Sequence, residues 1–109
     1  MTNQLGAEAA LASAARTLAL EIEGLKALAN SLATPFADAI DLIYAAKGRI
    51  IVTGMGKSGH VARKIAATMA STGTPAQFVH PGEAAHGDLG MITKDDVILA
   101  LSWSGEAPE

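Results

Sequence analysis

The 109-residue sequence contains no cysteine and few aromatic or charged residues: aromatic side chains make up 4% and charged side chains 17% of it. The lack of cysteine excludes disulfide frameworks and thiolate metal sites. The net charge is −3, from 8 basic and 11 acidic side chains, so the chain has no electrostatic footprint for a nucleic-acid backbone. A small molecule that carries a phosphate group is compatible with this composition.

The sequence also lacks the signs of export and of membrane insertion. Its opening residues contain no cationic region of the kind that begins a secretory signal, and charged side chains interrupt each apolar stretch before it reaches the ~20 residues of a membrane span. Hydrophobic residues make up 50% of the chain, which at this length is enough for one core but not for two. We therefore expect an uncleaved cytoplasmic domain, or part of one, with no nucleic-acid and no membrane partner.

The first part of the chain has the pattern of a long helix. Leucine recurs every seventh residue with smaller or branched apolar residues in between, which is the period of a helical seam. This period predicts a helix over about residues 5–31, in which Gly24 is a weak point. The seam consists of Leu11, Ala15, Leu18, Ile22, Leu25, Ala29 and Leu32. It needs a partner, either the rest of the domain or a second subunit, and a coiled-coil dimer is the sharper alternative.

A second helix is expected to follow. Thr34 suits the N-cap and Pro35 the first helical position, and apolar residues then recur on one face. Gly48 is expected to end this helix. Because the composition changes there, we divide the chain into a helical segment, residues 1–47, and a second segment, residues 48–109.

After residue 48 the pattern alternates between strand and helix. Short apolar stretches predict strands at residues 49–53, 76–79 and 96–101. A helix is expected over residues 58–72, ended by Gly73, and residues 80–94 have room for one short helix. The inner face of the longer helix is predicted to comprise Val61, Ile65, Thr68 and Met69. Strands that alternate with helices indicate an α/β fold with a parallel sheet and right-handed crossovers.

Three parallel strands make an incomplete core, because each strand of such a sheet expects helices on both faces. We therefore expect either that the chain is the front part of a larger domain or that an oligomer supplies the missing cover.

The first candidate motif is GMGKSG at residues 54–59, at a strand-to-helix turn. Its glycines fit the dinucleotide pattern G-x-G-x-x-G, but an acidic residue should then end the second strand, where Val79 and His80 stand. A P-loop would need glycine at the position of Ile51. A tight turn whose glycines allow close packing is another interpretation. Lys57 places a cation at the positive end of the helix dipole, where a cation is unfavourable. This suggests an anionic or polarisable ligand nearby.

The second motif is HPGEAAHGD at residues 80–88, at the carboxyl end of a strand. Ligands of open parallel sheets bind beyond that edge, so two histidines there favour a functional interpretation as much as a structural one. His-x5-His is not a recognised spacing for a closed zinc site. Metal binding is therefore expected to be incidental.

The third motif is SWSGE at residues 102–106, which follows the third strand at the same edge. Hydroxyls and freed backbone N–H groups ahead of a helix form an anion nest that suits a phosphate monoester. An ordinary N-capping turn has the same residues. Trp103 fits either a lid or a packing role.

Taken together, the segments GMGKSGH (54–60), ASTGTP (70–75), VHPGEAAHGDLG (79–90) and SWSGE (102–106) resemble bacterial arabinose-5-phosphate isomerases, which are sugar isomerase (SIS) domain proteins. The resemblance covers residues 48–109 closely and the helical segment more loosely. It implies a SIS-type three-layer fold, a parallel sheet flanked by helices, here truncated and preceded by two helices. It also implies assembly as a homodimer or homotetramer.

The resemblance further implies an activity. Arabinose-5-phosphate isomerases interconvert D-arabinose 5-phosphate and D-ribulose 5-phosphate through an enediol, for synthesis of the Kdo sugar of lipopolysaccharide. They require no redox cofactor. Lys57 matches the catalytic lysine, whose cation would stabilise an oxyanion, and Glu109 matches a catalytic glutamate, a candidate general acid or base. The substrate-binding positions match Ser58, Gly73, Thr74, His80, His86, Ser102 and Ser104, and His80 also matches a zinc-binding position.

Two departures from the family pattern matter. Family members have further strands and helices that carry another catalytic glutamate and a histidine, and many add CBS domains; moreover, Ala107 and Pro108 replace small hydroxylated residues. We therefore expect the 109-residue chain alone to be inactive and the full-length protein to be an isomerase. The alternatives are a non-catalytic sugar-phosphate-binding SIS module and nucleotide binding at the glycine turn, which predicts stabilisation by NAD or ATP.

Overall fold

The computed structural model describes residues 4–106, and the chain divides between Asp38 and Ala39 into two compact units. The sequence pattern placed the boundary later, after residue 47. The difference has a physical cause, because Ile43 and Ala46 pack against the buried core of the sheet. The end of the second helix therefore belongs to the sheet-containing unit.

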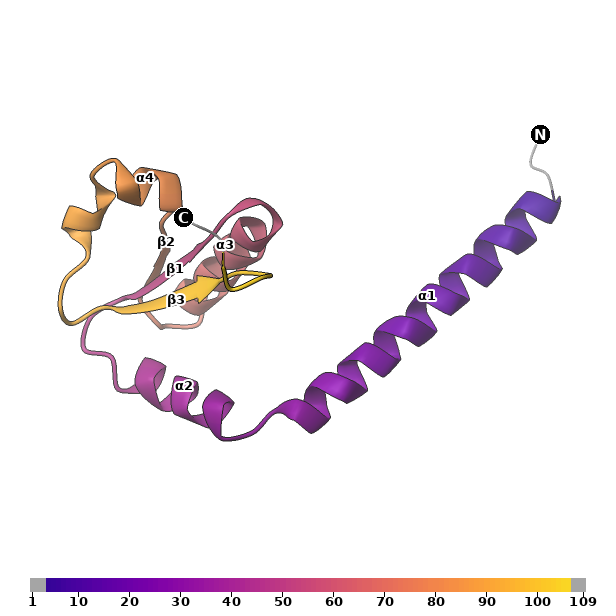
Figure 1. Ribbon diagram of the computed structural model, residues 1–109, viewed down its shortest axis with the longest axis horizontal. Helices are drawn as coiled ribbons and strands as arrows, with labels where there is room; N and C mark the ends of the chain where they lie inside the picture. The colour runs from indigo at the N-terminus through magenta and orange to yellow at the C-terminus, as the bar shows by residue number, and fades with distance from the viewer. Residues whose placement is uncertain (1–3, 107–109) are drawn as a thin grey trace. The chain divides into compact units, whose positions relative to one another are not determined.

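Helix α1 (Gln4–Ser31) confirms the predicted long helix (Figure 1). Its leucine seam is exposed: Leu18, for example, retains 63% of its accessible surface. The partner of the seam stays a prediction. Within residues 4–106, no helix combines the length and the apolarity that crossing a bilayer requires.

Helix α2 (Thr34–Tyr44) differs from its predicted ends. The carbonyl of Ala33 accepts hydrogen bonds from the amides of Phe36 and Ala37, at 3.0 and 3.3 Å, so Ala33 and not Thr34 stands at the cap. Gly48 is not the stop either, since the helix ends four residues earlier. A Cβ on Gly48 would lie 2.8 Å from the carbonyl oxygen of Asp95. Glycine is needed there for close approach of two backbone segments.

Three parallel strands form the sheet: β1 (Ile50–Gly54), β2 (Ala76–Phe78) and β3 (Val97–Leu101). Their order is β2-β1-β3, so the chain crosses over β1 between its second and third strands (Figure 1). Ile50 of the central strand pairs with Ala76 on one side and with Val97 on the other. The predicted parallel sheet is confirmed.

Helix α3 (Gly56–Ser71) covers one face of this sheet. Its buried residues are small, namely Gly59, Ala62 and Ala66, and they let the helix axis lie close to Ile50 and Val52. Two of the residues predicted for its inner face, Ile65 and Met69, do pack against the core. The other two do not: Val61 is 53% exposed, and Thr68 is also exposed. The prediction favoured large apolar residues where the contact needs small ones.

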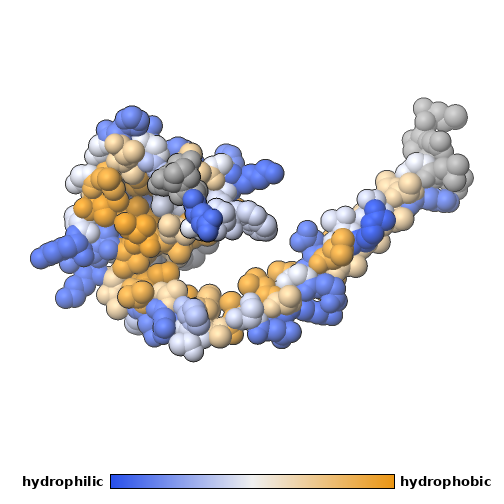
Figure 2. Space-filling model, viewed as in Figure 1, coloured by the Kyte–Doolittle hydropathy of each residue, from blue (hydrophilic) through white to orange (hydrophobic). Residues whose placement is uncertain are grey.

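The connection from β2 to β3 contains helix α4 (Pro81–Ala85) and a short 3-10 helix, η1 (Asp88–Met91), where one short helix was expected. This connection covers part of the second face of the sheet. Leu89 and Ile98 keep 59% and 55% of their surface exposed, and Figure 2 shows apolar surface on the sheet-containing unit. The second face is therefore only partly covered.

The amino ends of the strands are held by Asp96. Its carboxylate accepts hydrogen bonds from the amides of Arg49, at 2.7 Å, and Thr93, at 2.8 Å. These bonds, the one from Thr93 foremost, lower the pKa of Asp96 below its usual value. The Arg49 guanidinium in turn donates to Gln77 Oε1 at 2.6 Å and to the Met91 carbonyl at 2.8 Å. This network fixes the edge of the sheet opposite the candidate site.

Candidate ligand site at the carboxyl edge of the sheet

The strand order creates a crevice between the carboxyl ends of β1 and β3. The connection that leaves β1 runs through α3 to β2 on one side, whereas β3 lies on the other side. Ligands of open parallel sheets bind where connections diverge in this way. A cavity of about 360 Å³ lies there. Its lining comprises Thr53, Gly54, Met55, Ser58, Pro81 and residues 100–105.

Backbone conformation and close backbone contacts require glycine at three positions at the end of β1 and in the turn that follows. Gly56 has a φ of 55°, in the left-handed region. A Cβ on Gly59 would lie 2.6 Å from the carbonyl oxygen of Gly54, and one on Gly54 would lie 3.1 Å from that of Leu101. The tight-turn interpretation therefore explains all three glycines, and no nucleotide is needed to account for them.

The serine loop after β3 pairs with its own backbone. Ser102 Oγ accepts from the Gly105 amide at 2.9 Å, and Ser104 Oγ accepts from the Glu106 amide at 3.1 Å. Two amides of the predicted anion nest, those of Gly105 and Glu106, are therefore already paired, and the nest itself stays a prediction. Each hydroxyl still has its own hydrogen to donate. The hydroxyl-bearing residues Ser58, Ser102 and Ser104 all line the one cavity, as a phosphate site requires.

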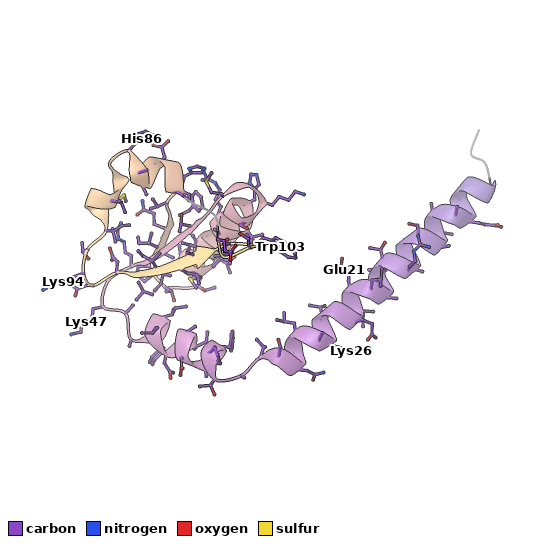
Figure 3. The ribbon with its side chains drawn as sticks, viewed as in Figure 1. Glu21, Lys26, Lys47, His86, Lys94 and Trp103 are labelled. Carbon is purple, nitrogen blue, oxygen red and sulfur yellow. The ribbon has the colours of Figure 1, made fainter. Side chains whose placement is uncertain are left out.

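Two further predicted residues concern the chemistry beside this cavity. Lys57 is the second residue of α3 and is exposed; it does not line the cavity. Helix α3 carries three cations and no carboxylate, and of the cations only Lys57 lies in its first turn. Glu109, the predicted acid or base, lies outside the described residues. Trp103 also lines the cavity and is 99% exposed (Figure 3).

The two histidines flank α4. His80 is half-buried at its N-cap, where Nδ1 accepts from the Gly82 amide at 2.9 Å. His86 is the exposed C-cap residue, and Figure 3 shows it at the far end of that helix. Pro81 lines the cavity but neither histidine does. The structure thus places His80 beside the site and His86 farther along the connection.

Gly73 and Thr74 lie elsewhere. They precede β2 and line a separate cavity of about 360 Å³ at the amino edge, together with Ala46, Gly48 and Ile50. Within one chain, the structure does not bring them together with the serine hydroxyls. Their predicted contact with substrate stays a prediction.

Three residues near the site were not singled out from the sequence. The guanidinium carbon of Arg63 lies 4.1 Å from the ring centre of Phe78, and this ring meets that of His80 edge to face at 6.4 Å and 67°. The Thr53 hydroxyl donates to the carbonyl of Val79. Residues two apart along an extended segment share a face, so the spacing of Phe78 and His80 could have revealed their contact.

The described residues do not fit a zinc site at His80. Within residues 4–106, no group of three or more histidine, aspartate and glutamate side chains is placed to hold a metal ion. A zinc-bound histidine normally donates a hydrogen bond through its second ring nitrogen. His80 instead accepts one there, from the Gly82 amide.

Comparison with known proteins places the sheet-containing part in a family. The SIS domain matches residues 42–109. The chain is 60% identical over 97 residues to the arabinose 5-phosphate isomerase KdsD of Pseudomonas aeruginosa, covering 89% of this chain and 30% of that protein. It is 56% identical over 92 residues to KdsD of Escherichia coli, covering 84% of this chain and 28% of that protein. The chain therefore spans about 30% of the length of these curated relatives.

Solved structures agree with this placement. An Escherichia coli protein determined in complex with arabinose 5-phosphate superimposes with a TM-score of 0.86 at 41% identity, covering 98% of this chain and 55% of that chain. A Bacteroides fragilis protein named as a phosphosugar isomerase involved in capsule formation gives a TM-score of 0.67 at 36% identity, covering 81% of this chain and 53% of that one.

Proposed function

Because the chain belongs to the SIS domain family, we propose that the protein is an isomerase that interconverts D-arabinose 5-phosphate and D-ribulose 5-phosphate. The observation that carries this proposal is that three serines, each with a hydroxyl, line one cavity at the carboxyl edge. The two relatives compared above, which bear the name of this activity, are 60% and 56% identical to the chain, which supports the same substrate class.

The phosphate group is proposed to lie in the cavity between β1 and β3. Ser102 and Ser104 have their oxygens occupied as acceptors for loop amides, so their hydrogens are free to point at phosphate oxygens. Ser58 joins them from the first turn of α3. Hydrogen bonds to a charged acceptor are stronger than neutral ones, so this arrangement favours an anion over a neutral sugar.

The isomerisation itself moves protons between adjacent carbons. A base removes the proton from C2 of the open-chain aldose while the C1 carbonyl oxygen gains one, which gives an enediol. A proton is then delivered to C1, and the C2 hydroxyl loses its proton to become the ketone. The aldose and the ketose are isomers, so no external oxidant is consumed and no redox cofactor is proposed.

The residue roles follow from this chemistry. Lys57 is proposed to stabilise the negative charge that develops on the carbonyl oxygen, and Glu109 to act as general acid or base. Lys57 suits this role because it is exposed at the start of α3, the helix that also presents Ser58 to the cavity.

The wider setting completes the proposal. The reaction is proposed to take place in the cytoplasm and to supply synthesis of the Kdo sugar of lipopolysaccharide. Within its own unit the seam of α1 is uncovered, with Leu11 at 72% and Leu25 at 65% exposure, and we propose that it mediates assembly as a homodimer or homotetramer. The chain spans about 30% of its curated relatives, so we propose that the 109-residue chain alone does not turn over arabinose 5-phosphate.

A pair of lysine variants tests the function. In the full-length protein, Lys57→Ala should lower kcat for arabinose 5-phosphate by about 10²–10³-fold, the usual cost of losing an oxyanion-stabilising donor. Lys64→Ala is the matched control, an exposed lysine two turns along the same helix, and should leave turnover unchanged. Near-normal turnover of Lys57→Ala would remove that lysine from the mechanism.

Two outcomes would contradict the proposed function more broadly. If the full-length protein binds arabinose 5-phosphate without converting it, the protein is a non-catalytic sugar-phosphate-binding module. If NAD or ATP raises its Tm and arabinose 5-phosphate does not, the glycine turn is a nucleotide site. Turnover by the 109-residue chain near that of the full-length protein would overturn only the expectation that the chain alone is inactive.

A further inference from the structure

His80 is a side chain whose orientation is fixed from several directions at this edge of the sheet. The backbone before it is anchored first. The Val79 amide donates to the Val52 carbonyl at 3.0 Å, and the Thr53 hydroxyl donates to the Val79 carbonyl. His80 itself is extended, with a φ of −70° and a ψ of 134°. Its Cβ is therefore tied to the end of β1 through two hydrogen bonds of the preceding residue.

The imidazole ring is held next. The ring of Phe78 meets it edge to face, with centres 6.4 Å apart and planes at 67°. Phe78 is held in turn by Arg63, whose guanidinium carbon lies 4.1 Å from the ring centre. Packing of a cation on the aromatic face and of a second ring at its edge are both favourable for the aromatic quadrupole. This stack restricts the rotation of the imidazole.

The third constraint is the hydrogen bond at Nδ1. It accepts from the Gly82 amide at 2.9 Å. A Cβ on residue 82 would lie 3.1 Å from Nδ1 and 3.2 Å from Cε1, which is tighter than ordinary contact. Glycine at this position therefore gives the imidazole room to sit over the amide that it caps.

An amide can donate only to a nitrogen that has a lone pair. While this bond is made, Nδ1 of His80 carries no hydrogen, so a neutral ring holds its hydrogen on Nε2. A histidine that ligates a metal through Nε2 has the opposite arrangement, with a lone pair at Nε2 and a hydrogen donated from Nδ1. The cap on α4 and zinc ligation by Nε2 are therefore mutually exclusive.

We propose that His80 is held as a hydrogen-bond donor through Nε2 and is not a zinc ligand. Phe78, Arg63 and Gly82 are its positioning residues. The donor hydrogen at Nε2 suits an oxygen acceptor of the kind that a sugar phosphate presents, and this last step rests on the proposed function. The tautomer and the absence of zinc ligation stand on the described contacts alone.

Two measurements without any sugar test the proposal. The first is the ¹⁵N NMR spectrum of the histidine rings in the full-length wild-type protein at neutral pH, which distinguishes a protonated from an unprotonated ring nitrogen. We expect His80 to carry its hydrogen on Nε2 and to keep its ring signals when stoichiometric Zn²⁺ is added. A hydrogen on Nδ1, or loss of the Nε2 hydrogen on adding Zn²⁺, would overturn the proposal.

The second measurement is a calorimetric Zn²⁺ titration of three variants of the full-length protein. His80→Asn keeps an acceptor that can cap α4, His80→Ala removes it, and His86→Asn is the control from the other end of the helix. We expect each variant to match wild type, whether wild type binds zinc or not. If both His80 variants lose zinc affinity by more than about tenfold, the loss expected even for a residue that only supports a ligand, while His86→Asn does not, His80 is a ligand.

These outcomes are separable from those of the proposed function. A protein that fails to bind arabinose 5-phosphate but shows His80 with its hydrogen on Nε2 refutes the isomerase and retains the tautomer. A protein that binds and converts the sugar phosphate while His80 is protonated on Nδ1 supports the isomerase and refutes the proposed tautomer.

Discussion

Replacing Gly59 with alanine should destabilise the protein even though alanine is the better helix former. Gly59 lies in the first part of α3 and is buried against the central strand. A Cβ at this position would lie 2.6 Å from the carbonyl oxygen of Gly54 and 3.3 Å from its carbonyl carbon. Because these atoms belong to the backbone of β1, no side-chain rotation relieves the overlap. The helix must move away from the sheet by several tenths of an ångström.

The magnitude follows from two opposing terms. Alanine gains about 1 kcal/mol over glycine inside a helix, and overpacking a well-packed core typically costs about 1–3 kcal/mol. The neighbour is backbone, so we take the upper end of that cost and expect a net loss of about 2 kcal/mol in the free energy of unfolding. For a unit of this size, the corresponding fall in Tm is about 8–16 °C.

Thermal and urea denaturation of Gly59→Ala, followed by circular dichroism, measure this loss. Gly24→Ala in α1 is the control, because a Cβ there meets no atom within 4 Å. That substitution should leave stability unchanged or raise it by up to about 1 kcal/mol. If Gly59→Ala is as stable as wild type, α3 does not lie as close to β1 as described, and the position of Ser58 beside the cavity loses its basis.

Three further predictions follow from individual contacts. Ser104→Ala should weaken binding of arabinose 5-phosphate by about 10–100-fold in a calorimetric titration, since a hydrogen bond to a charged group contributes about 1.5–3 kcal/mol; unchanged affinity would remove this hydroxyl from the phosphate site. Asp96→Asn should destabilise the protein at neutral pH but little in acid, measured by urea denaturation at both. The hydrogen bond from the Thr93 amide, the largest cause, lowers the folded-state pKa of Asp96. The stabilisation by the Asp96 carboxylate is therefore present above about pH 4 and disappears as the pH falls through the lowered pKa. A stability difference between variant and wild type that is independent of pH would contradict this. Leu18→Glu, on the seam of α1, should reduce self-association of the full-length protein in sedimentation, whereas Leu20→Glu, equally exposed but off the seam, should not; equal effects of the two would exclude the seam as the interface.

The elements of the fold were accessible from the sequence because their signals are local. A seven-residue leucine period gives α1, and a β-branched stretch before glycine gives β1. Helix α3 ends at Ser71, two residues before Gly73, whose φ of 99° glycine adopts freely. These features depend on residues close together in the chain, so a pattern can reveal them.

The misplaced features depend on contacts between distant segments. A glycine after a helical pattern is typical of a helix C-terminus. Gly48 is instead required by its close approach to the backbone of Asp95, far along the chain. The inner face of α3 uses Ala62 and Ala66 in place of Val61, because the distance to β1 admits only small side chains. Polarity alone could not reveal such distances.

The candidate site shows the same division. The sequence places Ser58, Ser102 and Ser104 at strand ends that meet in a parallel sheet, and the structure brings them to one cavity. The sequence could not show that the serine hydroxyls already accept hydrogen bonds from their own loop, nor that Nδ1 of His80 caps α4. Both hydrogen bonds depend on side-chain rotamers, which determine where the hydroxyl oxygen or the ring nitrogen points.

The position of the phosphate group tests the central claim most directly. A crystal structure of the full-length protein with arabinose 5-phosphate should show the phosphate oxygens within hydrogen-bond distance of the hydroxyls of Ser58, Ser102 and Ser104, between the carboxyl ends of β1 and β3. A phosphate bound away from these three hydroxyls, for example in the cavity beside Gly73 and Thr74 at the amino edge, would contradict the account.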